Sequence, residues 1–270
     1  MLQSRLIPVL LLSGGRLVKT RKYKNAVYIG DPTNTVRIFN ELEVDEIIVL
    51  DISASRKGEK PDFKLLEEIA NEAFMPMAYG GGVTSFSDAR TIFNIGFEKI
   101  ILNSAAISNN ELISEIASVY GNQAVVVSID VKRFPLLGRR VMRSGGRLLT
   151  NLHPDVWAVD AVGYGAGELL ITSIDNEGMW DGMDIPTIRS IADSVPVPVI
   201  AHGGVGELGH ILDALELGCA HGVAIGSAVV FQKKDNGVLV NFRLRDEFLL
   251  NGIKFEGANT PWPIKTPPAD

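Results

Sequence analysis

The chain contains the stretch Gly81-Gly82-Val83, followed by Asn103-Ser104-Ala105, and repeats it as Gly203-Gly204-Val205, followed by Gly226-Ser227-Ala228. The second copy lies 122 to 123 residues after the first. Self-similarity at a fixed spacing indicates a duplicated structural unit. The sequence therefore predicts two related halves.

Eight short apolar runs, rich in Val and Ile, provide the strands of these halves. They cover residues 6–11, 47–51, 77–80, 100–103, 124–130, 169–173, 199–202 and 223–226. Such runs are typical of parallel strands buried on both faces, and stretches with helical periodicity separate them. The pattern predicts one (β/α)₈ barrel, a TIM barrel, over residues 1–257, with a flexible Pro-rich tail at 258–270. A doubly wound open sheet is less favoured because it needs fewer strands and a Gly-rich first turn.

Composition narrows the class of protein. Of 270 residues, 46% are hydrophobic and 21% are charged, which is typical of a soluble globular protein. The net charge of −6, without a long basic run, argues against nucleic acid or an anionic membrane as a partner. The single cysteine, Cys219, can form neither an internal disulfide nor, by itself, a zinc site. We therefore expect a cytoplasmic protein.

In a TIM barrel the active site lies where the strands end, so the residues after the apolar runs are the candidates. Glycine pairs let the backbone approach a ligand closely, and helix N-termini favour anions. The predicted phosphate-binding residues are Gly81, Gly82, Asn103, Ser104, Gly203, Gly204, Gly226 and Ser227. Two such sites would suit a substrate with a phosphate at each end. The alternative is that each glycine pair only permits a tight turn.

Asp130 closes the fifth predicted strand, where a carboxyl group can serve as a general acid or base. The alternative is an inert carboxylate paired with Lys132. The symmetry-related position in the first half holds Leu11, which cannot transfer a proton. Further candidates on this face are Lys19, Asp51, Thr172 and Asp175.

Four charged residues of alternating sign stand at the opposite ends of the strands: Arg5, Glu46, Lys99 and Glu168. Charges at the closed bottom of a barrel stay ionised only when they pair with one another. The group is therefore either a stabilising ring of salt bridges or a gate through which a small polar molecule enters the barrel.

An insertion at residues 131–150 breaks the strand and helix rhythm and predicts a hairpin-like loop on the catalytic face. Basic side chains fill its 132–147 segment, which is either a solvated loop or a flap over an anionic ligand. The histidines show no metal-ligand spacing, and the chain has no nucleotide-binding fingerprint. We therefore expect neither a metal nor a bound cofactor.

The motifs Arg5-Leu-Ile-Pro8, Leu50-Asp-Ile-Ser-Ala-Ser55, Tyr79-Gly-Gly-Gly-Val83 and Gln123-Ala-Val-Val-Val-Ser-Ile-Asp130 closely resemble the HisF family. This family provides the cyclase subunit of imidazole glycerol phosphate synthase in histidine biosynthesis. The resemblance implies a ribulose-phosphate-binding barrel that takes a bis-phosphorylated precursor. It also implies ammonia supplied through the barrel by a HisH glutaminase docked at the bottom, and two catalytic aspartates.

The chain departs from the family at its catalytic end. Leu11 stands where the resemblance implies the first aspartate, His202 where it implies a phosphate-site serine, and Glu177-Gly-Met179 where it implies Asp-Gly-Thr. All four residues of the expected ammonia gate match.

This combination is similar to the HisF-like proteins encoded with surface-polysaccharide genes, the WbuZ type associated with glycosyl amidation. That resemblance implies a HisH-like glutaminase partner and a separate sugar amidotransferase that uses the ammonia. The alternatives are a cyclase in which another group replaces the missing aspartate, and a non-catalytic scaffold that regulates the glutaminase.

Overall fold

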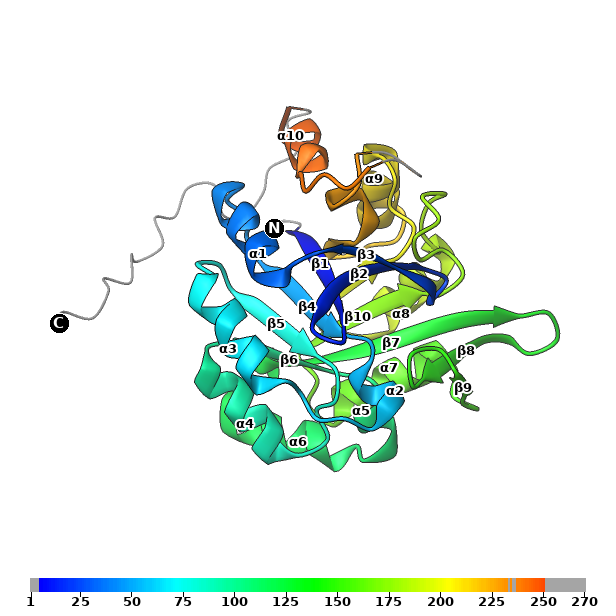
Figure 1. Cartoon of the computed structure of the whole chain (residues 1–270). Helices are drawn as coiled ribbons and strands as arrows, with labels where there is room; N and C mark the ends of the chain where they lie inside the picture. The colour runs from blue at the N-terminus through cyan, green and yellow to red at the C-terminus, as the bar shows by residue number, and fades with distance from the viewer. Residues whose placement is uncertain (1–4, 233, 235–236, 251–270) are drawn as a thin grey trace.

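A computed structural model describes residues 5–232, 234 and 237–250 of the chain. Within these residues, eight parallel strands follow one another around a circle in the order β10-β11-β12-β1-β4-β5-β6-β7, which the pairing of β7 with β10 closes (Figure 1). This confirms the TIM barrel and excludes an open doubly wound sheet. The barrel strands are β1 (Arg5–Ser13), β4 (Ile47–Asp51), β5 (Met77–Gly80), β6 (Lys99–Leu102), β7 (Val125–Phe134), β10 (Glu168–Ser173), β11 (Val199–His202) and β12 (Gly222–Ile225). The predicted tail at 258–270 lies outside the described residues.

The barrel has two apolar layers, because side chains alternate between the faces of each strand. Ile7, Val9 and Leu11 of β1 lie in a cluster inside the barrel, with side chains such as Ile48 and Ile101 from other strands. The intervening residues of β1 pack outward against the helices. The interior is thus filled with aliphatic side chains and is not an open pore.

Helices surround the sheet, and side chains cap the N-termini of three of them. The side chains of Asp31, Ser85 and Asp184 each accept a hydrogen bond from a backbone N–H in the first turn of α1, α4 and α8, respectively. The α-helices are α1 (Pro32–Glu41), α2 (Ala54–Lys57), α3 (Phe63–Glu72), α4 (Phe86–Ile95), α5 (Ser104–Ser108), α6 (Glu111–Tyr120), α7 (Pro154–Gly163), α8 (Ile185–Ser194), α9 (Leu208–Glu216) and α10 (Arg243–Leu250), and the 3₁₀ helices are η1 (Asn122–Ala124) and η2 (Ser227–Val229). No helix in this described part of the chain has the length and apolar character needed to cross a membrane.

The first strand of each half extends beyond the barrel into an antiparallel hairpin. After β1 the chain turns at Gly14 and Gly15, both with positive φ, into β2 (Arg16–Arg21) and β3 (Lys24–Gly30). This first hairpin was not predicted from the sequence. After β7 come β8 (Gly138–Arg143) and β9 (Leu148–Leu149), which confirms the hairpin predicted within 131–150. Figure 1 shows β7 and β8 reaching away from the barrel.

The second hairpin corrects the position of Asp130. We expected the fifth strand to end at this residue, but β7 continues for four residues to Phe134. Asp130 pairs with Thr172 of β10 on one side and with Met142 of β8 on the other. The backbone partner that β8 supplies allows the strand to continue past the barrel rim. Asp130 is therefore held on both sides by neighbouring strands.

Candidate active site

The mouth of the barrel contains a pocket with an empty volume of about 850 Å³. Its walls combine the ends of strands from the first half with Asp130 from the second half. Six of the predicted site residues line it, namely Asp51, Gly81, Gly82, Asn103, Ser104 and Asp130. The structure thus brings the first-half candidates together with the candidate acid or base.

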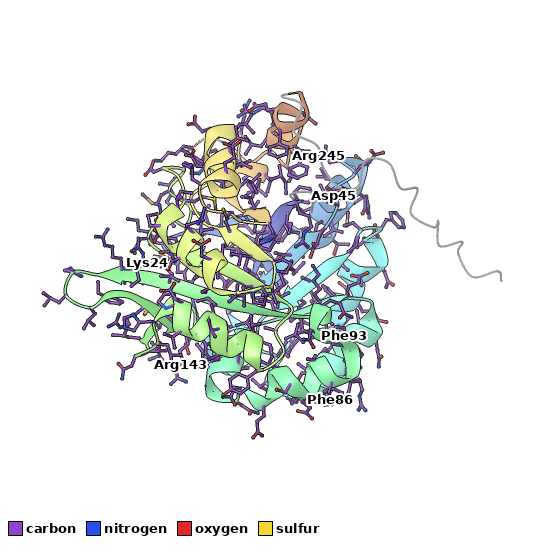
Figure 2. The ribbon with its side chains drawn as sticks, turned by 180° about the vertical axis from the view of Figure 1, so that it is seen from behind. Lys24, Asp45, Phe86, Phe93, Arg143 and Arg245 are labelled. Carbon is purple, nitrogen blue, oxygen red and sulfur yellow. The ribbon has the colours of Figure 1, made fainter. Side chains whose placement is uncertain are left out.

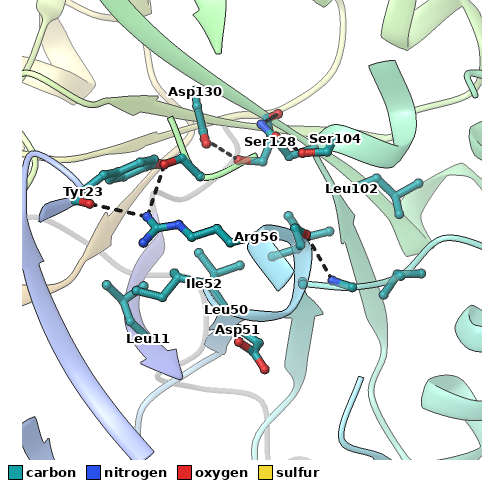
Figure 3. Close-up of a pocket in the computed structure, with 18 of the residues that line it drawn as sticks. Leu11, Tyr23, Leu50, Asp51, Ile52, Arg56, Leu102, Ser104, Ser128 and Asp130 are labelled. Atoms are coloured by element: carbon teal, nitrogen blue, oxygen red, sulfur yellow. Dashed lines mark hydrogen bonds between the residues drawn. The ribbon is translucent and has the colours of Figure 1, made fainter. Parts of the chain in front are cut away.

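Asp130 is buried in the wall of this pocket. Its carboxylate accepts a hydrogen bond from Ser128 Oγ at 3.1 Å (Figure 3). Burial raises the pKa of this carboxyl to about 6, although Ser128, the Tyr23 hydroxyl and Arg56 oppose the shift. The groups that act on Asp130 are these three rather than the predicted partner Lys132. A pKa near the working pH suits a general acid or base.

Leu11 lies in the same pocket but belongs to the apolar interior. Its side chain is 6% exposed and packs in the inner cluster of the barrel. Figure 3 shows Leu11 and Asp130 on different sides of the pocket, with Arg56 between them. One wall of the pocket therefore carries the ionisable carboxyl group of Asp130, and the wall formed by Leu11 is aliphatic.

The second-half candidates line a smaller cleft of about 280 Å³ beside this pocket. Its walls include Gly203, Gly204, Gly226 and Ser227, together with Glu177 and His202. The Glu177 carboxylate accepts hydrogen bonds from Thr20 Oγ1 at 2.8 Å and from the Tyr23 backbone N–H at 3.0 Å. Burial, followed by the nearby Lys19 charge, lowers the pKa of His202 to about 3, so its ring is neutral at pH 7. The two halves thus present different chemistry at equivalent places.

The glycine pairs are needed by the backbone in both halves. Gly81 and Gly203 have φ values of +122° and +94°. A Cβ atom at these positions would lie 2.4 Å from the Asp51 carbonyl oxygen and 2.8 Å from that of Ser173. The backbone therefore requires glycine at both positions, and contact of these glycines with phosphate stays a prediction.

The four remaining candidates have different surroundings. Lys19 is buried and its Nζ donates to the Val9 carbonyl; burial lowers the pKa of this amine to about 7, although Glu177 opposes the shift. Thr172 Oγ1 lies 3.1 Å from His202 Nδ1. The Asp51 carboxylate accepts from the Ser53 backbone N–H at 2.8 Å and fixes its own loop.

Asp175 is not part of the pocket wall. Its carboxylate accepts the Arg133 backbone N–H at 2.9 Å, at the start of the β7–β8 hairpin. We infer that it supports this hairpin, whereas Asp51 lines the pocket.

The four charged residues at the bottom form a closed ring. Arg5 Nη1 donates to Glu46 Oε2 at 2.8 Å and Arg5 Nη2 donates to Glu168 Oε1, while Lys99 Nζ donates to Glu46 at 2.8 Å and to Glu168 at 2.9 Å. Burial raises the pKa of the Glu168 carboxyl, but Lys99 and Arg5 outweigh it and hold that pKa below its usual value. Each carboxylate of the ring therefore contacts both cations, as the alternating signs predicted.

Tyr23 and Arg56 line the pocket but were not predicted from the sequence, and no contact was predicted for Glu177. Glu177 and Arg56 hold Tyr23 from two sides, because Arg56 Nη2 donates to the Tyr23 carbonyl at 3.4 Å. One signal was available: Gly14-Gly15 between apolar residues favours a two-residue hairpin turn. That signal predicts the turn between β1 and β2, but not the following turn between β2 and β3, in which Tyr23 lies.

Comparison with known proteins agrees with this architecture. The histidine biosynthesis protein family matches residues 5–235. A protein of Leptospira interrogans, provisionally named imidazole glycerol phosphate synthase subunit HisF, is 44% identical over 92% of this chain and 98% of its own length. The chain belongs to the HisF family. A Pseudomonas aeruginosa HisF-family protein, provisionally named subunit hisF2, is 43% identical over 90% of this chain and 96% of its own. A third HisF relative, from Vibrio vulnificus and provisionally named hisF3, is 39% identical over 90% of this chain.

Proposed function

We propose that the chain is the HisF-like subunit of a glutamine-dependent synthase, and that it receives ammonia from a HisH-like glutaminase. The names of the relatives, subunits of imidazole glycerol phosphate synthase, support a partner of this kind. The observation that carries the proposal is the closed ring of Arg5, Glu46, Lys99 and Glu168 beneath an aliphatic barrel interior. Such an interior admits neutral ammonia and penalises ammonium, because an unpaired buried charge is costly.

We propose further that the ammonia serves the amidation of a sugar in surface-polysaccharide synthesis, through a separate amidotransferase in the cytoplasm. Leu11 supports this reading, because the pocket has an aliphatic wall where the resemblance implies a second proton-transferring aspartate. A phosphorylated small molecule would bind at the glycine loops of the mouth.

One observation favours the alternative, a cyclase of histidine biosynthesis. Asp130 keeps a buried carboxyl with a pKa of about 6, which suits proton transfer. Supplying the bis-phosphorylated imidazole precursor with excess ammonium above pH 8 separates the two functions. The proposal expects turnover at least about 100-fold below that of a two-aspartate cyclase. Turnover equal to such a cyclase would overturn it.

The passage through the barrel is tested with Lys99→Ala in the complex with the glutaminase. We expect more glutamine hydrolysed per product formed, because the side chain that closes the ring is lost. This ratio does not depend on how much of the variant is folded, and Lys64→Ala on exposed α3 is the matched control. An unchanged ratio would argue for the third reading, a regulatory scaffold, and against conduction.

A further inference from the structure

A second cavity, of about 420 Å³, adjoins the active-site pocket outside the barrel mouth. It lies between the β2–β3 hairpin and the segment from β7 to the loop after β8. We call it the cationic cavity, because five basic residues line it: Lys22, Lys24, Arg56, Lys132 and Arg147. Among the residues that the structure describes, no aspartate or glutamate lines this cavity. Figure 2 shows Lys24 on the side of the molecule from which the β7–β8 hairpin extends.

Arg56 stands at the boundary between the two cavities and is held by backbone contacts. Its Nη2 donates to the carbonyls of Tyr23 at 3.4 Å and Gly145 at 3.2 Å. Its Nε is buried and has no hydrogen-bond partner among the described residues. At Gly145, φ is +61° and a Cβ would lie 2.4 Å from this Nε, so glycine leaves room for the guanidinium. Arg56 is therefore fixed in the shared wall of the two cavities, and its Nε–H donor has no partner among the described residues.

The charges in this cavity repel one another. Burial and then the nearby Arg147 lower the pKa of the Arg56 guanidinium, while Tyr23 and Asp130 oppose the shift. In the part of the chain that the structure describes, none of the five basic side chains is in an ion pair with a carboxylate. A concave surface lined by one sign of charge concentrates its field and attracts counter-ions. The chain as a whole carries a net charge of −6, so this local excess is not a general property of its surface.

We propose that the cationic cavity binds the diphosphate group of a ligand whose remaining part enters the active-site pocket. Tyr23, Arg56, Thr20 and Gly145 line both cavities, which makes the path continuous. A diphosphate matches the site better than a single phosphate, since the cations lie on two separate segments of the mouth. A guanidinium with free donors suits phosphate oxygens, and the volume falls within the usual range for small-molecule sites.

The test measures binding of inorganic pyrophosphate to the chain alone by calorimetry, and then binding of a nucleoside diphosphate. The double variant Lys132→Ala/Arg147→Ala should bind pyrophosphate at least about tenfold more weakly, because two charge-assisted contacts are lost. Arg133→Ala is the matched control, since Arg133 neighbours Lys132 on β7 but is absent from the cavity wall. This control should bind as the unmodified protein does.

Equal affinity of the unmodified protein and the double variant would overturn the proposal, and so would an equal loss in Arg133→Ala. Phosphate that binds as tightly as pyrophosphate would refute a diphosphate site. A pyrophosphate-induced rise in the melting temperature, lost in the double variant, would confirm binding by an independent measurement, and a cooperative melting transition of the variant would show that it is folded. The assay uses neither glutaminase nor turnover, so its result is separate from the proposed ammonia transfer.

Discussion

The two ends of the barrel use the same kinds of long basic side chain in opposite ways. At the bottom, Arg5 and Lys99 each contact both Glu46 and Glu168, and the ring has no unpaired member. At the mouth, five basic residues line one cavity without a carboxylate. A folded chain gains nothing from gathering like charges, because their repulsion opposes compaction. We infer that the charges of the bottom ring balance one another, whereas the positive charges at the mouth require an anionic ligand to balance them.

The largest expected effect breaks the bottom ring. Lys99→Ala leaves two buried carboxylates with Arg5 as their remaining partner, so the free energy of unfolding should fall by about 2–4 kcal/mol. Lys132→Ala at the mouth should change it by less than about 0.5 kcal/mol, as is usual for a substitution that leaves no buried partner. Urea unfolding of both variants makes the comparison. Equal losses would show that the two clusters do not differ in this way.

A second prediction compares Asp130 at the mouth with Glu168 at the bottom. The contributions of these two carboxyl groups to the free energy of unfolding should change with pH in opposite directions. The folded-state pKa of Asp130 is about 6, against an ordinary value of 3.8 for an aspartate, so its contribution to stability falls as pH rises from about 4 to 6. Asp130→Asn should therefore raise the free energy of unfolding by about 1–3 kcal/mol at pH 7 and by much less near pH 4.

Glu168 should show the opposite sign. Its folded-state pKa lies below 4.5, so its contribution is present above that pH and is lost as pH falls through the folded value. Urea unfolding at several pH values, with Glu168→Gln beside Asp130→Asn, measures both slopes. Parallel slopes in the two variants would contradict the assigned shifts.

The smallest expected effect is a response to salt. Raising the ionic strength from low to about 0.5 M shortens the screening length to a few ångströms, which weakens repulsion among the exposed cations at the mouth. The unmodified protein should gain about 0.5 kcal/mol relative to Lys132→Ala/Arg147→Ala, which lacks two of these charges. Thermal unfolding in NaCl measures the difference. A gain of the same size in the double variant would locate the repulsion elsewhere.

Much of the site followed from local sequence patterns. Continuous apolar runs identify buried parallel strands, and the residue after each run lies at the mouth whatever the loops do. Asp130 and the bottom ring were found in this way. Tyr23 and Arg56 were not, because Tyr23 lies in the turn between β2 and β3 and Arg56 on the single-turn helix α2, and neither segment has a hydrophobic period to place it. Asp175 shows the limit of sequence patterns: Asp51 lines the pocket, whereas Asp175 accepts a hydrogen bond from the β7–β8 hairpin.

The sequence by itself determined the barrel, its two related halves, the alternating charges at the bottom and the loss of a carboxyl group at Leu11. These features depend on the spacing of apolar residues along the chain and on residue identity, and both can be read from the sequence alone. Only the tertiary structure decided that Lys22 and Lys24 share a cavity with Arg56, Lys132 and Arg147. Residues more than 100 positions apart meet there because two hairpins fold over the same mouth, and the direction of a hairpin is set by its packing rather than by its own sequence.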